Sequence, residues 1–223
     1  MFNAYDLVKK ELSELLKTIC ASAGAEHICV SVRGCEAASA LPLSKGLCAE
    51  ECKRAICSAL SANAPGADMV ERVTAQNGRL CFELTNGFYD AALCRINATP
   101  MPQLPQSFDS QVEYALCRMI MAARKPHSSC PLDDGVRRLV WRSFSIVSCA
   151  DDPKRLHARL REVSAAALAL GVGLSIRERD TLMRNSAAAC AAVARLIAFG
   201  IENEGGIIYG DKMAGTFMLF ADI

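Results

Sequence analysis

The stretch MVERVTAQNGRLCFEL, residues 69–84, decides the fold that we expect for the first half of the chain. It contains two β-rich runs, 69–74 and 80–84, on either side of Asn77 and Gly78. Asn-Gly is a favoured hairpin turn because both residues tolerate the positive φ angles of a tight two-residue turn. The stretch therefore predicts a pair of antiparallel strands.

Helix and strand signals around this hairpin extend it into a small α+β domain. Apolar residues recur at helical spacing over 3–23, and a β-rich run covers 28–32. Further helices are expected over 47–60 and 88–96. We place this domain at residues 1–97.

A proline-rich segment follows the first domain and predicts a linker at residues 98–108. It contains Pro100, Pro102 and Pro105. Each proline removes a backbone donor and pushes the preceding residue out of the helical region.

The chain beyond the linker predicts a helical bundle at residues 109–204. Asp152 and Pro153 form a typical helix start, with an acidic residue near the N-cap and proline near the first helical position. The other helices are expected over 112–125, 136–149 and 178–201. Residues 205–223 form a C-terminal extension with a short β-like pattern. The predicted fold class is mainly α, with a small α+β N-terminal domain.

Charge and cysteine usage limit the classes of site that we expect. A nucleic-acid module is usually basic overall, so the net charge of +1 argues against strong non-specific RNA affinity and leaves a local basic face open. The 12 cysteines include no Cys-x-x-Cys pair, and no histidine lies near Cys48, Cys52 and Cys57. We interpret them as reduced, small apolar side chains and expect neither a metal nor a cofactor.

The sequence also predicts a cytoplasmic protein without a membrane segment. Charged residues run through positions 1–20, where a signal peptide would need an apolar core. No apolar run is long enough to cross a bilayer.

Three segments of the helical half resemble the DALR anticodon-binding domain of arginyl-tRNA synthetases. They are QVEYALCR at 111–118, DPKRLHARL at 152–160 and DTLMR at 180–184. The resemblance implies that Tyr114 and Arg118, four residues apart on one helix face, contact anticodon bases through stacking and hydrogen bonds. Leu116 stands where the family usually has histidine.

The first half resembles the N-terminal additional domain of the same enzymes. QNGRLC at 76–81 corresponds to a loop that usually reads Gly-Pro-Gly-Phe-Ile-Asn and lies near the D-loop of tRNA. Gly78 is retained, whereas Arg79 and Cys81 replace the aromatic residue and the amide. The resemblance implies that Arg79 contacts tRNA by stacking or by binding a phosphate.

The catalytic core of those synthetases has no counterpart in the sequence. The chain contains no His-x-Gly-His motif, and Lys212-Met213-Ala214-Gly215 shares two letters with the family's Lys-Met-Ser-Lys motif. We therefore expect no enzyme activity from this chain, and aminoacylation only with a catalytic partner in trans.

Arginines at helical spacing are candidates for binding the phosphates of an anticodon stem. Arg138 shares a helix face with Arg142, and Arg155 shares one with Arg159. The competing interpretation is a solvated helix face, which neighbouring acidic residues favour: Asp133, Asp134, Asp151 and Asp152. Trp141, between apolar neighbours, is expected in the core.

Three functions remain open from the sequence. The first is a non-catalytic protein that binds tRNA, with arginine isoacceptors among the candidates, through its helical bundle. The second is a protein-interaction or structural module derived from the synthetase that no longer binds RNA. The third, a thiol-based enzyme, lacks a cysteine signature paired with a base.

Overall fold

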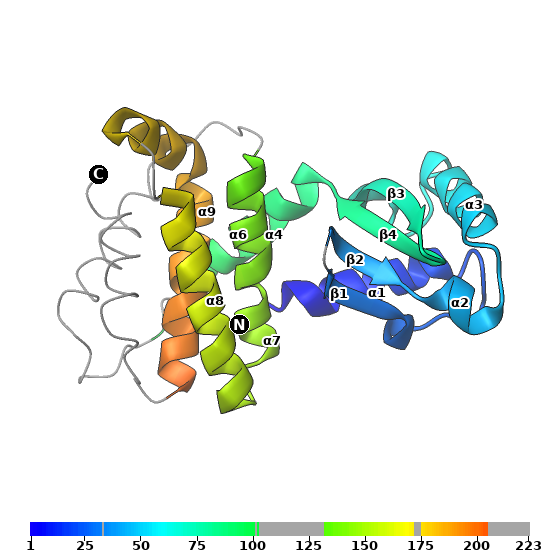
Figure 1. Cartoon of the computed structure of the whole chain (residues 1–223), viewed down its shortest axis with the longest axis horizontal. Helices are drawn as coiled ribbons and strands as arrows, with labels where there is room; N and C mark the ends of the chain where they lie inside the picture. The colour runs from blue at the N-terminus through cyan, green and yellow to red at the C-terminus, as the bar shows by residue number, and fades with distance from the viewer. Residues whose placement is uncertain (33, 101, 103–131, 172–174, 205–223) are drawn as a thin grey trace. The chain divides into compact units, whose positions relative to one another are not determined.

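The computed structural model describes residues 1–32, 34–100, 102, 132–171 and 175–204, and these residues are mostly helical (Figure 1). Contacts divide the chain into two units. One is Asn3–Ala92, and the other comprises Met1–Phe2 and Leu93–Ile223. The division into a first domain, a linker, a helical bundle and a C-terminal extension stays a prediction. Residues 103–108 of the linker and the whole extension, 205–223, lie outside the described residues.

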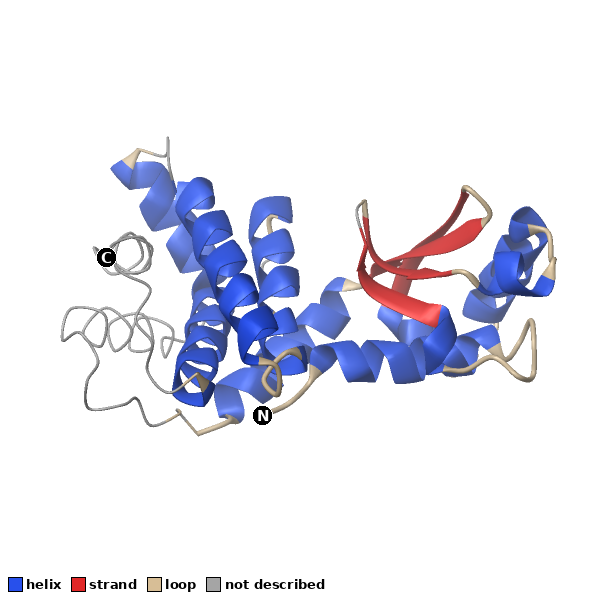
Figure 2. Ribbon diagram, turned by 60° about the horizontal axis from the view of Figure 1, so that its bottom comes forward, coloured by secondary structure: helices blue, strands red, loops and turns tan. Residues whose placement is uncertain are grey.

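The first unit contains a four-stranded antiparallel sheet with the strand order β1-β2-β4-β3. Its strands are β1 Ile28–Val32, β2 Cys35–Ser39, β3 Val70–Gln76 and β4 Arg79–Leu84. Helices α1 (Ala4–Leu16), α2 (Leu41–Lys45) and α3 (Ala49–Ser61) pack against these strands. Figure 2 draws the strands in red beside the blue helices.

The predicted hairpin is confirmed, including its turn. Gln76 pairs with Arg79, and the two residues between them, Asn77 and Gly78, have φ angles of 49° and 73°. Along β4, Leu80 and the next alternate residues face the core, while the intervening side chains face away. The turn thus fixes which side chains of β4 are buried.

Several short elements of the first unit were not predicted, and one helix is shorter than predicted. Strand β2 and the five-residue helix α2 were not expected, and both are short. The helix predicted over 3–23 ends at Leu16. Beyond Leu16 the backbone tightens into turns, in which the Thr18 N–H donates to the Leu15 carbonyl at 3.2 Å and the Ile19 N–H to the Leu16 carbonyl at 3.0 Å.

Helix α4, Asn86–Ala98, covers the helix predicted over 88–96, and the division between the two units falls within it. In the first unit, its fully buried Tyr89 donates a hydrogen bond of 2.9 Å to Glu36 Oε1 of β2. The other carboxylate oxygen of Glu36 accepts from the Leu84 backbone N–H at 3.0 Å. A single carboxylate therefore joins β2, β4 and α4.

The second unit contains α6 (Asp134–Ser143), α7 (Ser145–Ser148), α8 (Pro153–Gly171) and α9 (Ile176–Asn203), which pack on one another (Figure 1). Helices were predicted over 136–149, from 152 and over 178–201. The first of these was wrongly predicted as continuous, because α6 ends at Ser143 and α7 begins at Ser145, with Phe144 between them. The helix predicted over 112–125 lies outside the described residues.

The core prediction for Trp141 is confirmed. Its side chain is buried and meets Phe144 edge-to-face, with ring centroids 5.9 Å apart. Among the residues that the structure describes, no helix combines the length and the apolar character that crossing a bilayer requires.

Two glycines with left-handed backbone conformations provide a matched test of packing in the first unit. A Cβ at Gly66 (φ 80°) would lie 2.5 Å from the backbone oxygen of Glu11, whereas a Cβ at Gly46 (φ 65°) would meet nothing within 4 Å. We expect Gly46→Ala to lower the free energy of unfolding by about 1 kcal/mol, which is the cost of holding alanine in a left-handed backbone conformation. Gly66→Ala should lower it by about 3 kcal/mol or more, because backbone must also move.

Urea denaturation followed by circular dichroism measures both losses. Equal losses for the two variants would contradict the close approach of α1 to Gly66.

Candidate functional site

Two of the arginines predicted to bind RNA lie on the exposed side of α6. Arg138 and Arg142 are both exposed, and they are one helical turn apart. The opposite side of α6 is buried through Val136, Leu139 and Val140. Packing of that apolar side therefore directs both guanidinium groups toward solvent.

The other two predicted arginines lie on α8, which packs on α6 (Figure 1). Arg155 is exposed, whereas Arg159 is partly buried and forms an ion pair of 2.5 Å with Glu162. Leu156 and Leu160 bury the other side of this helix. Each of these two neighbouring helices therefore carries two arginines that are four residues apart and lie on the same face of the helix.

Acidic residues beside these arginines cap the two helices. Asp133 is the N-cap of α6, and its carboxylate accepts from the Gly135 N–H at 2.8 Å. Asp152 Oδ1 accepts from the Arg155 N–H at 3.2 Å at the start of α8. Their negative charge is directed to unpaired backbone donors at helix N-termini, where it is favourable.

Arg79 is exposed at the first position of β4, directly after the hairpin turn. It belongs to the first unit, and the other described arginines of the predicted site belong to the second. Tyr114 and Arg118, which the resemblance assigns to anticodon bases, lie outside the described residues. Their role stays a prediction.

A buried arginine was not foreseen by the sequence analysis. Arg195 of α9 is only 9% exposed, and its guanidinium donates to the Thr99 carbonyl at 2.7 Å. Nearby on the same helix, the Ala188 carbonyl accepts from the Asn97 side chain at 3.0 Å. The signal in the sequence was a charged residue at the end of an alanine-rich run. These two bonds fasten the segment after Ile96 to α9.

His157 of α8 forms a second polar link within the bundle. Its Nδ1 lies 3.1 Å from Glu204 Oε1, and the glutamate side chain is only 5% exposed. A buried carboxylate needs such a partner, because desolvation of an unpaired charge is costly. The contact joins α8 to the residue that follows α9.

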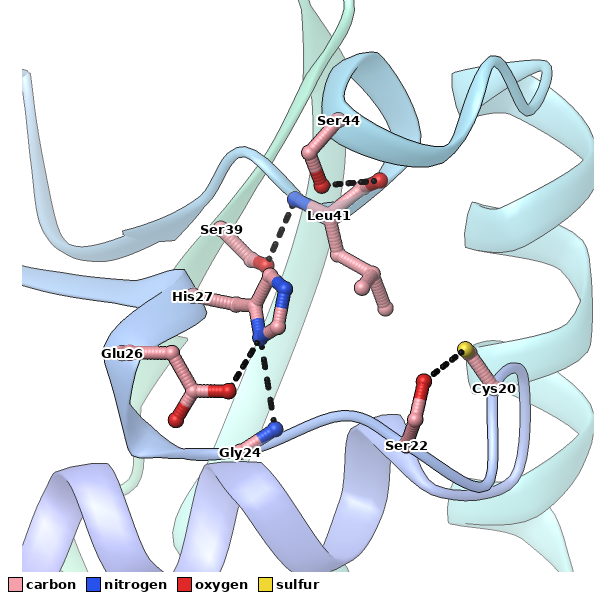
Figure 3. A network of polar contacts seen from close by, with 8 residues as sticks. All are labelled: Cys20, Ser22, Gly24, Glu26, His27, Ser39, Leu41 and Ser44. Atoms are coloured by element: carbon pink, nitrogen blue, oxygen red, sulfur yellow. Dashed lines mark hydrogen bonds and ion pairs between the residues drawn. The ribbon is translucent and has the colours of Figure 1, made fainter.

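Figure 3 shows polar contacts at the end of α1 and around β2 in the first unit. The Cys20 thiol lies 3.2 Å from the Ser22 hydroxyl. His27 Nδ1 accepts from the Gly24 N–H at 3.3 Å and also lies 3.0 Å from Glu26 Oε1. Cys20 and His27 thus have separate partners, which is not the arrangement of a catalytic thiol and its base.

The pKa values of the Cys20 and Cys190 thiols are shifted in opposite directions. Hydrogen bonds from Ser22, and more weakly the charge of Lys45, lower the pKa of the partly exposed Cys20 thiol. Burial raises the pKa of Cys190 to about 12. No group of three or more His, Cys, Asp or Glu side chains among the described residues is arranged to hold a metal ion.

No family model, no curated protein and no solved structure matched the chain. The resemblance to arginyl-tRNA synthetases therefore rests on the sequence motifs alone.

The lowered pKa of Cys20 leads to a prediction on thiol reactivity. The thiolate is the reactive form, and a lower pKa increases its fraction at neutral pH. We expect iodoacetamide at pH 7 to alkylate Cys20 faster than the exposed Cys57, and to spare the buried Cys190 in the folded protein. Peptide mass spectrometry over a time course measures the three rates.

The matched variant is Ser22→Ala, which removes the largest cause of the shift and should slow alkylation at Cys20. An unchanged rate in Ser22→Ala would show that this hydrogen bond does not control the thiol.

Proposed function

We propose that this chain is a non-catalytic tRNA-binding protein, related to arginyl-tRNA synthetase, that binds the anticodon arm through its helical bundle in the cytoplasm. The observation that carries the proposal is the placing of arginines on two helices that pack together: Arg138 and Arg142 on α6 and Arg155 on α8 are exposed, and Arg159 of α8 is partly buried. A double-helical RNA stem presents phosphates in rows, and arginines on neighbouring helices suit such a target.

In the proposed site, some side chains contact phosphates and others contact bases, according to their chemistry. The arginines of α6 and α8 neutralise phosphates, which contributes affinity without base selectivity. Tyr114 and Arg118 supply base contacts through ring stacking and hydrogen bonds, as the family resemblance implies. Arg79, exposed at the hairpin of the first unit, adds a contact elsewhere on the tRNA.

The proposal includes no catalytic step by this chain. The sequence lacks the motifs that hold ATP phosphates in arginyl-tRNA synthetases. Aminoacylation would require a separate catalytic subunit that acts on the tRNA bound here, with arginine isoacceptors as the first candidates.

A second candidate function is supported by exposed apolar side chains in the first unit. Leu43 and Leu47 are 56% and 41% exposed, and Leu43 lies against Gly78 at the hairpin turn. These two side chains, four residues apart, would supply apolar contacts to a second copy of the chain. For this candidate, light scattering should give a mass above the monomer, and Leu43→Ser with Leu47→Ser should lower it.

Substitution of the α6 arginines tests the RNA-binding proposal. We expect Arg138→Ala with Arg142→Ala to weaken tRNA binding roughly tenfold and to reduce the slope of log affinity against log salt by about 2. Fluorescence anisotropy with labelled total tRNA at several salt concentrations measures both quantities.

The matched control is Lys53→Ala with Arg54→Ala, which removes the same charge from α3, where both cations pair with glutamates one turn away. Equal loss of affinity in the two double variants would assign the effect to net charge. Absence of saturable tRNA binding by the unmodified chain would falsify the proposal.

A further inference from the structure

Two Asn-Gly pairs lie in the first unit, in different local structures. Asn77-Gly78 forms the turn between β3 and β4, and Asn86-Gly87 opens α4. Both asparagines are exposed. Asparagine before glycine is chemically labile, because glycine has no Cβ to hinder the approach of its backbone nitrogen to the asparagine Cγ. The sequence treats the two pairs alike, so any difference between them comes from the structure.

The hairpin turn leaves the groups that would react without hydrogen bonds. The β3–β4 ladder ends with the pair of Gln76 and Arg79, so Asn77 and Gly78 lie outside it. Within the described part of the chain, the Gly78 N–H donates to no acceptor and the Asn77 side-chain amide bonds to no partner. Rotation about the Cα–C bond of Asn77, which brings the Gly78 nitrogen toward Cγ, therefore breaks no hydrogen bond of either residue.

The start of α4 holds the second pair in place. The Thr85 hydroxyl accepts from the Phe88 N–H at 3.2 Å, and the Thr85 carbonyl accepts from the Tyr89 N–H at 3.4 Å. Phe88 and Tyr89 are themselves buried. The same rotation at Asn86 would move Gly87 out of the helical conformation and break this cap.

A third asparagine separates backbone conformation from reactivity. Asn63 is exposed and has a φ of 51°, close to the 49° of Asn77. The residue that follows it is Ala64, whose N–H donates to the Ala59 carbonyl at 3.0 Å. The Cβ of Ala64 also hinders the approach of its nitrogen. Among these three asparagines, Asn77 alone has both a following glycine and a following peptide group that is free of hydrogen bonds.

We propose that Asn77 is a site of spontaneous deamidation, through a cyclic imide that the Gly78 nitrogen closes. This nitrogen attacks Asn77 Cγ and gives up its proton, and the bond from Cγ to the side-chain nitrogen breaks to release ammonia. Water then opens the imide. Attack on the side-chain carbonyl gives aspartate, and attack on the main-chain carbonyl gives isoaspartate. Water is consumed, ammonia is released, and no atom is oxidised or reduced.

The two products affect the hairpin differently. Aspartate keeps the main chain intact, and Asp-Gly is itself a favoured two-residue turn. Isoaspartate carries the main chain through Cβ and lengthens the loop, which then no longer matches the register that buries Leu80 and Phe82. Either product also adds a negative charge two residues before the exposed Arg79. Deamidation therefore changes the surface charge at the turn and, in its isoaspartate form, weakens the sheet.

The experiment incubates the folded full-length chain at mildly alkaline pH and follows the peptides of the three asparagines by mass spectrometry. We expect the Asn77 peptide to convert roughly tenfold faster than the Asn86 peptide, the order of magnitude that disruption of a helix cap imposes. The Asn63 peptide should remain unconverted. A protein isoaspartyl methyltransferase, used as a probe, should label the Asn77 product.

Two controls separate the effect of structure from that of sequence. In urea, where neither the turn nor α4 is formed, the Asn77 and Asn86 peptides should convert at similar rates. Thr85→Ala removes the side-chain cap of α4 and should speed conversion at Asn86 without changing it at Asn77. Because the main comparison is made within the unmodified chain, the test does not depend on the folding of a variant.

Conversion of Asn86 as fast as Asn77 in the folded chain would overturn the inference. So would an Asn77 peptide that stays intact in the folded chain for as long as the urea-unfolded chain needs to convert fully. That result would mean that the hairpin restrains the Asn77–Gly78 peptide as firmly as α4 restrains its first turn.

Discussion

Asn77 and Gly78 both adopt left-handed backbone conformations, and this two-residue turn sets the register of β3 against β4. In a strand, a shift of one residue exchanges the buried and exposed faces. The register places Leu80, Phe82 and Leu84 in the core of the first unit and leaves Cys81 and Glu83 on the other face. The exposed position of Arg79, directly before Leu80, depends on this constraint.

In both units, polar side chains form hydrogen bonds with backbone groups, and some also bond to one another. Glu36 accepts from Tyr89 and from the Leu84 N–H, so one carboxylate ties a helix and two strands. Arg195 donates to the Thr99 carbonyl from a largely buried position. Buried polar groups are costly unless they are paired, and truncation of one partner leaves the other unsatisfied. These contacts therefore specify how each unit packs.

The charges of the bundle illustrate how local structure separates opposite signs on a chain of nearly neutral net charge. Asp133 and Asp152 accept from N–H groups at helix starts, while Arg138, Arg142 and Arg155 lie along exposed helix sides. Arg159 is the exception, because its ion pair with Glu162 offsets part of its charge. A phosphate-binding face on this chain would therefore depend most on Arg138, Arg142 and Arg155.

The sequence by itself determined the elements that carry strong local signals. Asn77-Gly78 specified the hairpin, and apolar residues at helical spacing specified α1, α3, α4, α6, α8 and α9 to within a few residues at most ends. It also identified Trp141 as a core residue and the α6 arginines as surface residues, because the period of the apolar residues fixes which helix side is buried.

Tertiary structure decided what depends on residues distant in sequence. Strand β2 carries small residues with weak strand preference and forms because β1 and β4 pair with it on both sides. The buried guanidinium of Arg195 finds its acceptor in Thr99, and the carboxylate of Glu36 finds its donors in Leu84 and Tyr89. Sequence periodicity describes one element at a time, whereas these contacts are set by how separate elements meet in space.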